Sequence, residues 1–157
     1  MRKQKGFSLI ELLIVVAIIL IIAAIAIPNL MRAKMAANEA SAVGSLRTIN
    51  TSAVEYSTTY GIGYPGSLGA LGGTGTATSA SADLIDSVLS SGTKSGYTFT
   101  YTGGSPDGSG SIDTYTLTAT PVTTGVTGQR MFFTDQSGVI RANASGSGAT
   151  INSTPIG

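Results

Sequence analysis

Residues 6–28 read GFSLIELLIVVAIILIIAAIAIP, an apolar run of membrane length that contains one charged side chain, Glu11. From Phe7 to Ile27, a helix rising ~1.5 Å per residue would be about 32 Å long, close to the ~30 Å hydrocarbon core of a bilayer. A carboxylate inside such a span is costly and commonly marks a functional site with a partner. Since the span contains no Lys, Arg or His, the sequence predicts that the partner of Glu11 comes from elsewhere.

The flanks of the apolar run orient it. Arg2, Lys3 and Lys5 precede the run, which favours a cytoplasmic N-terminus. Arg32 and Lys34 follow it, so the charge asymmetry is modest.

Three other interpretations of the run fit less well. A cleaved secretory signal has a shorter apolar core and an Ala-x-Ala-like cleavage site, and no clear site follows this run. A plain membrane anchor fits the length but gives the carboxylate no purpose. A buried core helix fits poorly, because nothing in the remaining chain could wrap it on all sides.

The N-terminal residues resemble those of a known family. A basic leader ending in Lys5-Gly6, followed by Phe7-Ser8-Leu9-Ile10-Glu11 and an apolar run that ends at Pro28, is similar to a type IV prepilin. The resemblance implies cleavage between Gly6 and Phe7 by a prepilin peptidase, and N-methylation of the new amine on Phe7. It also implies that Glu11 meets the Phe7 amine of a neighbouring subunit. Such charge pairing contributes register more surely than net stability.

A second helical pattern follows the apolar run. Its apolar positions recur at spacings of three and four, which is typical of one helical face; they are Val43, Leu46, Ile49, Ala53, Tyr56 and Tyr60. We therefore expect one long helix over residues 7–60, with a kink or local melting near Pro28 because proline cannot donate the helical hydrogen bond. Residues 7–28 form its transmembrane or filament-core part, and residues 29–60 its amphipathic part, which packs on a head domain.

Residues 61–157 are expected to form that globular head. The Gly- and Ser-rich residues 61–80 predict a loop, and residues 81–91 predict a short helix with Ser81 as its cap and Gly92 just past its end. Alternating apolar and Thr residues then predict an antiparallel sheet of about four strands within residues 95–142. A C-terminal tail follows. The predicted fold class is α+β, with the second half of the long helix packed on the sheet.

Composition excludes several kinds of chemistry. The chain has no His and no Cys, so it lacks the usual general base, thiolate metal ligands and disulfides. Many pilins close their C-terminal region with a disulfide, so here either neighbouring subunits hold the tail or it is loose. A net charge of +1 gives no electrostatic case for nucleic-acid binding. We expect no enzymatic activity and no cofactor.

Two weaker motifs have simpler explanations. Gly61, Gly63 and Gly66 match a dinucleotide-binding pattern, but they follow a helix where that motif requires a strand. Asp107 and Asp113 offer oxygens to Ca²⁺ from one loop, although a true calcium loop carries more carboxylates and a bidentate acid. A hydrophilic hairpin tip is the favoured interpretation of that loop.

Threonine rows within residues 98–102 and 114–120 predict a hydroxyl-rich sheet face. A solvated face made of good strand formers is favoured. A binding surface or a site for O-linked sugars is the alternative.

The favoured functional hypothesis is structural. A type IV pilus subunit would wait in the inner membrane with its N-terminus in the cytoplasm, lose its leader, and polymerise through its N-terminal helix into an extracellular filament. Expected partners are other pilin subunits, a prepilin peptidase and methyltransferase, an assembly platform and a motor ATPase. The alternatives are a pseudopilin of a type II secretion system, a membrane-tethered binding module that keeps residues 1–6, and a tethered enzyme, which the missing His and Cys disfavour.

Overall fold

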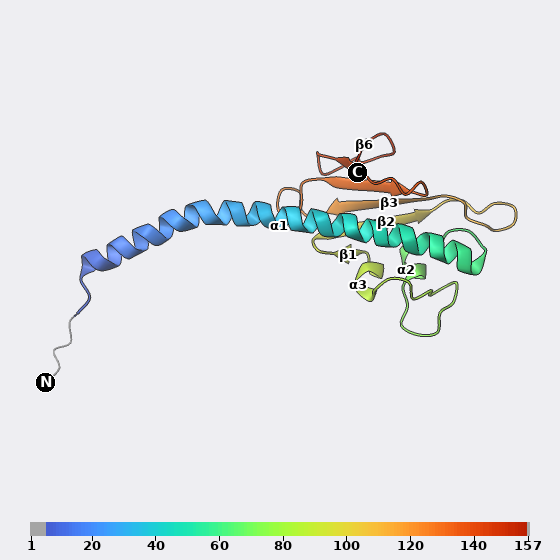
Figure 1. Cartoon of the computed structure of the whole chain (residues 1–157), viewed down its shortest axis with the longest axis horizontal. Helices are drawn as coiled ribbons and strands as arrows, with labels where there is room; N and C mark the ends of the chain where they lie inside the picture. Colours follow the sequence, from blue (N-terminus) through green and yellow to red (C-terminus); the bar gives the residue numbers. More distant parts are fainter. Residues whose placement is uncertain (1–5, 157) are drawn as a thin grey trace. The chain divides into compact units, whose positions relative to one another are not determined.

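The computed structural model of the chain describes residues 6–156. The basic cluster of the predicted leader, Arg2, Lys3 and Lys5, lies outside the described residues. Contacts divide the chain into two compact units, one ending at Lys34 and one beginning at Met35. The elements in chain order (Figure 1) are α1 (Leu9–Tyr60), α2 (Leu68–Leu71), α3 (Ser87–Ser90), β1 (Thr93–Lys94), β2 (Tyr97–Gly103), β3 (Tyr115–Pro121), β4 (Met131–Asp135), β5 (Arg141–Asn143) and β6 (Thr154–Pro155).

The strands form one antiparallel sheet in the order β1-β2-β3-β4-β5-β6, so the predicted α+β class is confirmed. The predicted count of about four strands is wrong, because the sheet formed by residues 6–156 has six. The two additional strands, β1 and β6, are its edges and contain two residues each. A two-residue strand cannot show the alternation from which strands are predicted, which explains why both were missed.

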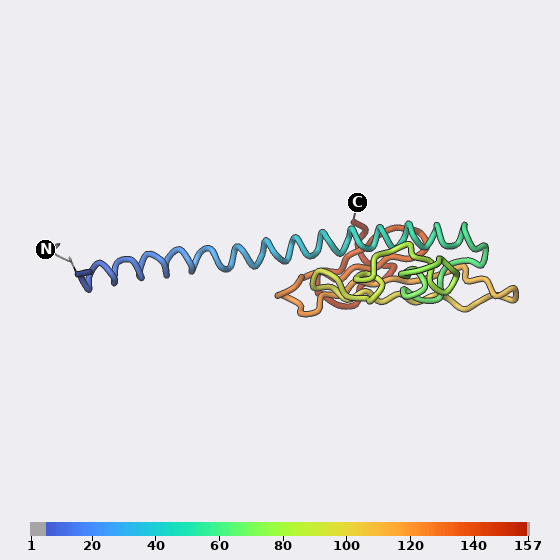
Figure 2. The backbone as a smooth tube through the Cα atoms, turned by 90° about the horizontal axis from the view of Figure 1, so that it is seen from below, coloured from blue at the N-terminus to red at the C-terminus, as the bar shows by residue number. Residues whose placement is uncertain are grey.

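The sheet buries one face against the second half of α1. In β2, Tyr97, Phe99 and Tyr101 are buried while the threonines between them are exposed. Figure 2 shows the cyan-to-green part of α1 running alongside the strands. The predicted helical stripe is confirmed as core: Leu46 and Ile49 are fully buried and belong to the same apolar cluster as the sheet residues. Burial on one face therefore fixes both the helix rotation and the strand register.

Residues 81–91 are helical only at their end, so the predicted short helix is wrong over its first half. Asp83 has a φ of 55°, a left-handed conformation that a helix does not tolerate. Asp86, not Ser81, caps α3, and its Oδ1 accepts the Leu89 N–H at 2.9 Å. The prediction of Gly92 just past the helix end is confirmed, with a φ of 85°.

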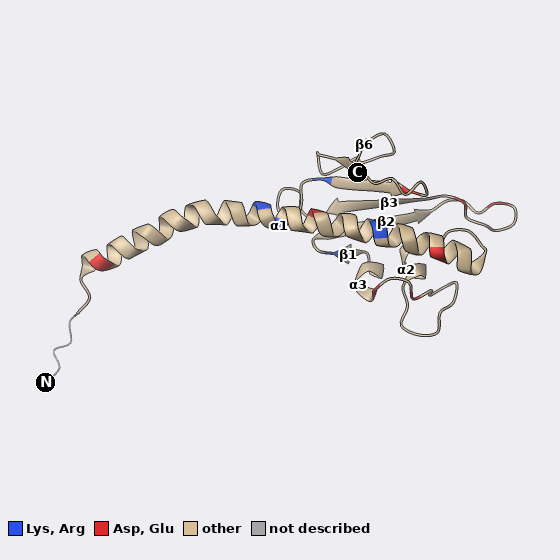
Figure 3. Cartoon of the chain, viewed as in Figure 1, with Lys and Arg blue, Asp and Glu red and all other residues tan. Residues whose placement is uncertain are grey.

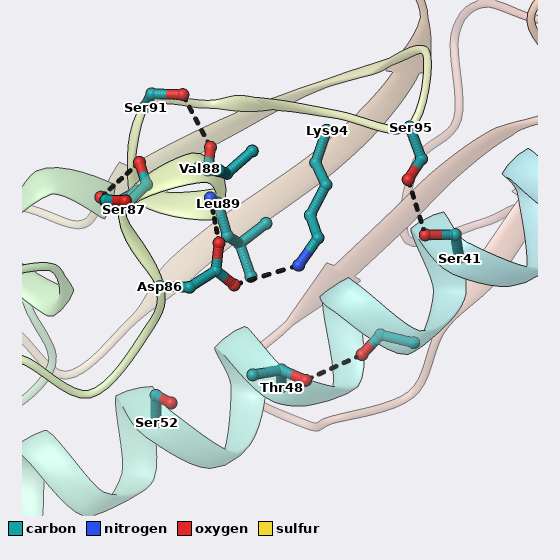
Figure 4. Close-up of polar contacts among 12 residues, drawn as sticks. Ser41, Thr48, Ser52, Asp86, Ser87, Val88, Leu89, Ser91, Lys94 and Ser95 are labelled. Atoms are coloured by element: carbon teal, nitrogen blue, oxygen red, sulfur yellow. Dashed lines mark hydrogen bonds and ion pairs between the residues drawn. The ribbon is translucent and has the colours of Figure 1, made fainter.

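Hydrogen bonds join α3 to β1, and the residue after β1 to α1 (Figure 4). Lys94 Nζ donates to Asp86 Oδ2 at 3.0 Å, so the cap residue also holds the first strand. Just beyond β1, Ser95 Oγ accepts a 2.9 Å bond from Ser41 Oγ on α1. This bond between two small hydroxyl side chains holds the residue after β1 against α1.

The predicted loop over residues 61–80 contains α2, and one of its glycines has a structural role. Gly63 has a φ of 80° and forms a parallel bridge with Ile112. A side chain at Gly63 would collide with the Ile112 backbone. The second glycine of the apparent dinucleotide motif is therefore explained by a chain crossing.

The C-terminal tail is held by the sheet of its own chain. Thr154 pairs with Ala142 across β5 and β6. The Ile156 N–H donates to the Ile140 carbonyl at 2.9 Å, and Arg141 Nη1 donates to the Ser153 carbonyl at 3.3 Å. These bonds to the sheet replace the disulfide that the sequence lacks.

Glu39 fastens the connection between β3 and β4 to α1. Its Oε1 accepts the N–H groups of Gln129 and Arg130 at 2.9 and 3.0 Å, and its Oε2 accepts Arg130 Nε at 2.8 Å. The Glu39 side chain is only 12% exposed. Burial by itself would raise the pKa of this carboxyl, but the two backbone N–H groups and the Arg130 guanidinium hold the pKa below its usual value.

Glu39→Gln is expected to destabilise the head in a pH-dependent way. The lowered pKa means that ionised Glu39 stabilises the fold above about pH 4.5, the ordinary value, and that this contribution is lost as the pH falls through the lower folded-state pKa. We expect a loss of ~1–3 kcal/mol at pH 7 and a smaller difference at pH 3, measured by thermal unfolding of the full chain in micelles. Glu55→Gln, at an exposed position of α1, is the control. Equal destabilisation at both pH values would contradict the ion-pair explanation.

Candidate functional site

The first half of α1 presents apolar side chains on every side. It contains a stretch that is long and apolar enough to cross a membrane. Side chains from Leu9 to Val16 are all exposed, and Phe7 is 84% exposed. In Figure 3 this half is tan apart from one red position near its start and blue positions near its end. Since water does not tolerate so large a continuous apolar surface, this segment requires a membrane or other apolar helices around it.

Glu11 has a partner within its own chain. The Ser8 N–H donates to Glu11 Oε2 at 2.9 Å, while the Leu12 N–H donates to the Ser8 carbonyl at 3.3 Å. Ser8 thus precedes the first helical residue, and Glu11 reaches back to its backbone as in one arm of a capping box. The sequence prediction that Glu11 depends wholly on an outside partner is incomplete, although the pattern Ser-x-x-Glu already signalled this contact.

Among residues 6–156, this hydrogen bond is the one polar contact of the Glu11 side chain. Only one of the two carboxylate oxygens accepts a hydrogen bond from a described residue, and no described cation forms an ion pair with it. The bond also fixes the carboxylate at the first turn of α1, three residues from Ser8 and four from Phe7. The Glu11 carboxylate is therefore a positioned acceptor with one oxygen that no described residue uses, and such an oxygen can receive a cationic donor.

Pro28 lies inside α1, which remains helical on both sides of it. Local melting at this residue is therefore not observed. The kink remains a prediction, because continuous helical structure is compatible with a bend at the missing hydrogen bond.

Asp107 and Asp113 use their carboxylates within the hairpin tip. Asp107 Oδ1 accepts hydrogen bonds from the Ser109 N–H, the Ser109 hydroxyl and the Ser111 N–H. These bonds lower the pKa of Asp107, and the bond from the Ser109 hydroxyl contributes most. Asp113 Oδ1 accepts the Ser111 hydroxyl at 3.1 Å. Within residues 6–156, no group of three or more acidic, His or Cys side chains is placed to hold a metal.

Comparison with known proteins places the likeness in the N-terminal segment. Residues 1–27 match the family described as "Prokaryotic N-terminal methylation motif". A 39-residue stretch over the motif region is 64% identical to the "Type IV wide pilus major component PilA4" of Thermus thermophilus. That stretch covers 25% of this chain and 30% of the relative's length. No solved structure was found to match. The chain therefore carries the N-terminal motif of type IV prepilins.

Proposed function

We propose that the chain is a structural subunit of a type IV pilus. The N-terminal methylation motif supports this assignment, and so does the exposed apolar helix that follows it. The observation that carries the proposal is the coincidence of the motif with the geometry at Glu11. There a carboxylate is fixed at the start of that helix, and no described residue forms an ion pair with it.

Processing would create a positive charge at the N-terminus with which Glu11 can pair. Cleavage between Gly6 and Phe7 by a prepilin peptidase leaves a new amine on Phe7, and N-methylation keeps that amine cationic. Near the bilayer surface the Glu11 carboxylate and this amine are each poorly solvated when alone. Between two chains each becomes the counter-ion of the other, and their attraction at ~4 Å is about 4 kcal/mol at an effective dielectric near 20.

The apolar half of α1 would contact lipid before assembly and the apolar helices of neighbouring subunits after it. In the precursor it lies in the inner membrane, with the N-terminus in the cytoplasm. After assembly by a platform and a motor ATPase, the apolar helices pack together as the filament core, and the sheet domains form the extracellular surface. Cleavage and pairing at Glu11 set the register, whereas close van der Waals packing between the apolar helices holds the polymer together.

The direct test is the N-terminus of the assembled protein. We expect filaments sheared from cells to contain a chain that begins at Phe7 and whose mass exceeds that of the unmodified cleaved chain by one methyl group. Edman sequencing and intact mass spectrometry would measure both. Mature filaments that retain Met1 would contradict the proposal. If no surface filaments can be sheared from cells, and if deletion of the gene abolishes protein secretion, the chain would instead be a secretion pseudopilin.

A further inference from the structure

The sheet carries a pocket on the face opposite α1. Its cavity volume is about 420 Å³, and it lies where Thr102, Thr116 and Asp135 stand side by side on β2, β3 and β4. The strand register pairs Thr102 with Thr116 and Thr116 with Asp135. Thr134, the neighbour of Asp135, points the other way and bonds to Asn50 of α1. Because side chains alternate along a strand, Asp135 faces away from α1 and into this pocket.

Asp135 is a buried carboxylate with which no described Lys or Arg forms an ion pair. It is 6% exposed, and its Oδ1 accepts the Ser137 N–H at 2.9 Å. Oδ2 has no hydrogen-bond donor among the described residues. If Oδ2 were fully buried, it would be a buried polar atom without a partner, but among the described residues only the Tyr101 hydroxyl is such an atom. Asp135 Oδ2 therefore reaches the pocket surface. No Lys or Arg lines the pocket, and within residues 6–156 no cation forms an ion pair with this carboxylate.

Apolar groups flank the carboxylate. Phe133, one step along the outer face of β4, is partly exposed in the pocket. Ile151, which is 56% exposed, lines the pocket from the connection between β5 and β6. Gln136 and the two threonines add neutral polar groups. The pocket thus offers one anionic acceptor beside an aromatic ring and an aliphatic wall.

We propose that this pocket binds a primary ammonium group carried on a short apolar stem. The ammonium donates to Asp135 Oδ2 and neutralises its charge, while the stem lies against Phe133 and Ile151. An anionic ligand would be repelled by Asp135, and a neutral polyol would leave a buried charge uncompensated. The inference is independent of the proposed pilus function, because every residue of the pocket belongs to the unit that begins at Met35.

The test is a titration of the full chain, in nonionic detergent micelles, with n-butylammonium chloride at constant ionic strength. We expect saturable NMR shifts at the Thr116, Gln136 and Ile151 amides. Asp135→Asn should weaken binding about tenfold or more, because a hydrogen bond to a charged group is lost. Asparagine can still accept the Ser137 N–H, so the turn should persist. Ile151→Ser, at an exposed position, should weaken binding severalfold through the lost apolar contact.

Matched controls make the outcome decisive. Asp113→Asn removes an acid that does not line the pocket, and binding should be unchanged. n-Butanol, the neutral probe of similar shape, should cause no saturable shifts. Equal shifts with n-butanol or sodium chloride, equal weakening by Asp113→Asn, or full affinity in Asp135→Asn would each overturn the proposal.

Discussion

A Glu11→Val chain should enter the membrane and lose its leader but yield few or no filaments. Valine keeps the segment apolar, so insertion should be preserved. The Phe7 amine of the neighbouring subunit would then be buried without its counter-ion. Removing one partner of a buried ion pair costs ~3–5 kcal/mol, which corresponds to at least about a hundredfold weaker association per contact. Immunoblots of membrane and sheared fractions, with electron microscopy, would measure the loss.

Glu11→Gln separates the two contacts of this side chain. Its amide oxygen can still accept the Ser8 N–H, because glutamine also completes a capping box, but it carries no charge. We expect Glu11→Gln to assemble almost as poorly as Glu11→Val. Normal filaments from Glu11→Gln would mean that Glu11 acts by capping α1 and that its pairing with the Phe7 amine is not needed.

Leu46→Ala should produce a large loss of head stability. Leu46 is fully buried between the helix and the sheet. Truncating a buried leucine removes its transfer free energy and leaves a cavity, with a typical cost of ~3–5 kcal/mol. Since domains of this size are stabilised by only ~5–15 kcal/mol, a large fraction of the total would be lost. Urea unfolding of the full chain in micelles, followed by tyrosine near-UV circular dichroism, would measure it.

Val54→Ala is the matched control on the same helix. Val54 is 53% exposed, and its truncation should change the free energy of unfolding by less than ~0.5 kcal/mol. If Leu46→Ala and Val54→Ala had equal effects, the assignment of the buried face of α1 would be wrong.

Long periodic segments were predictable, because their signal is repeated over many residues. The stripe at Leu46, Ile49 and Tyr56 indicated which face of α1 is buried, and the alternation in residues 97–102 indicated β2. Short elements were not predictable. The two-residue strands β1 and β6 depend on pairing with β2 and β5, and the start of α3 depends on the left-handed conformation of Asp83.

At the N-terminal segment, the sequence predicted the apolar span and the processing motif, and it marked Glu11 as exceptional. The contact between Ser8 and Glu11 is the one that the spacing Ser-x-x-Glu of a capping box predicts. The effect of Pro28 could not be predicted, because it depends on how the neighbouring structure accommodates the missing hydrogen bond and not on residue spacing.

The sequence by itself determined the apolar span, the position of its one carboxylate and the amphipathic face of α1, because composition and helical period fix these locally. Only the tertiary structure decided how Glu39 holds the β3–β4 connection, how the tail is secured without a disulfide, and that Asp135 is buried beside Phe133 and Ile151. Those features join residues far apart in the chain. Their partners are set by strand register and by chain crossings, which no local pattern of residues encodes.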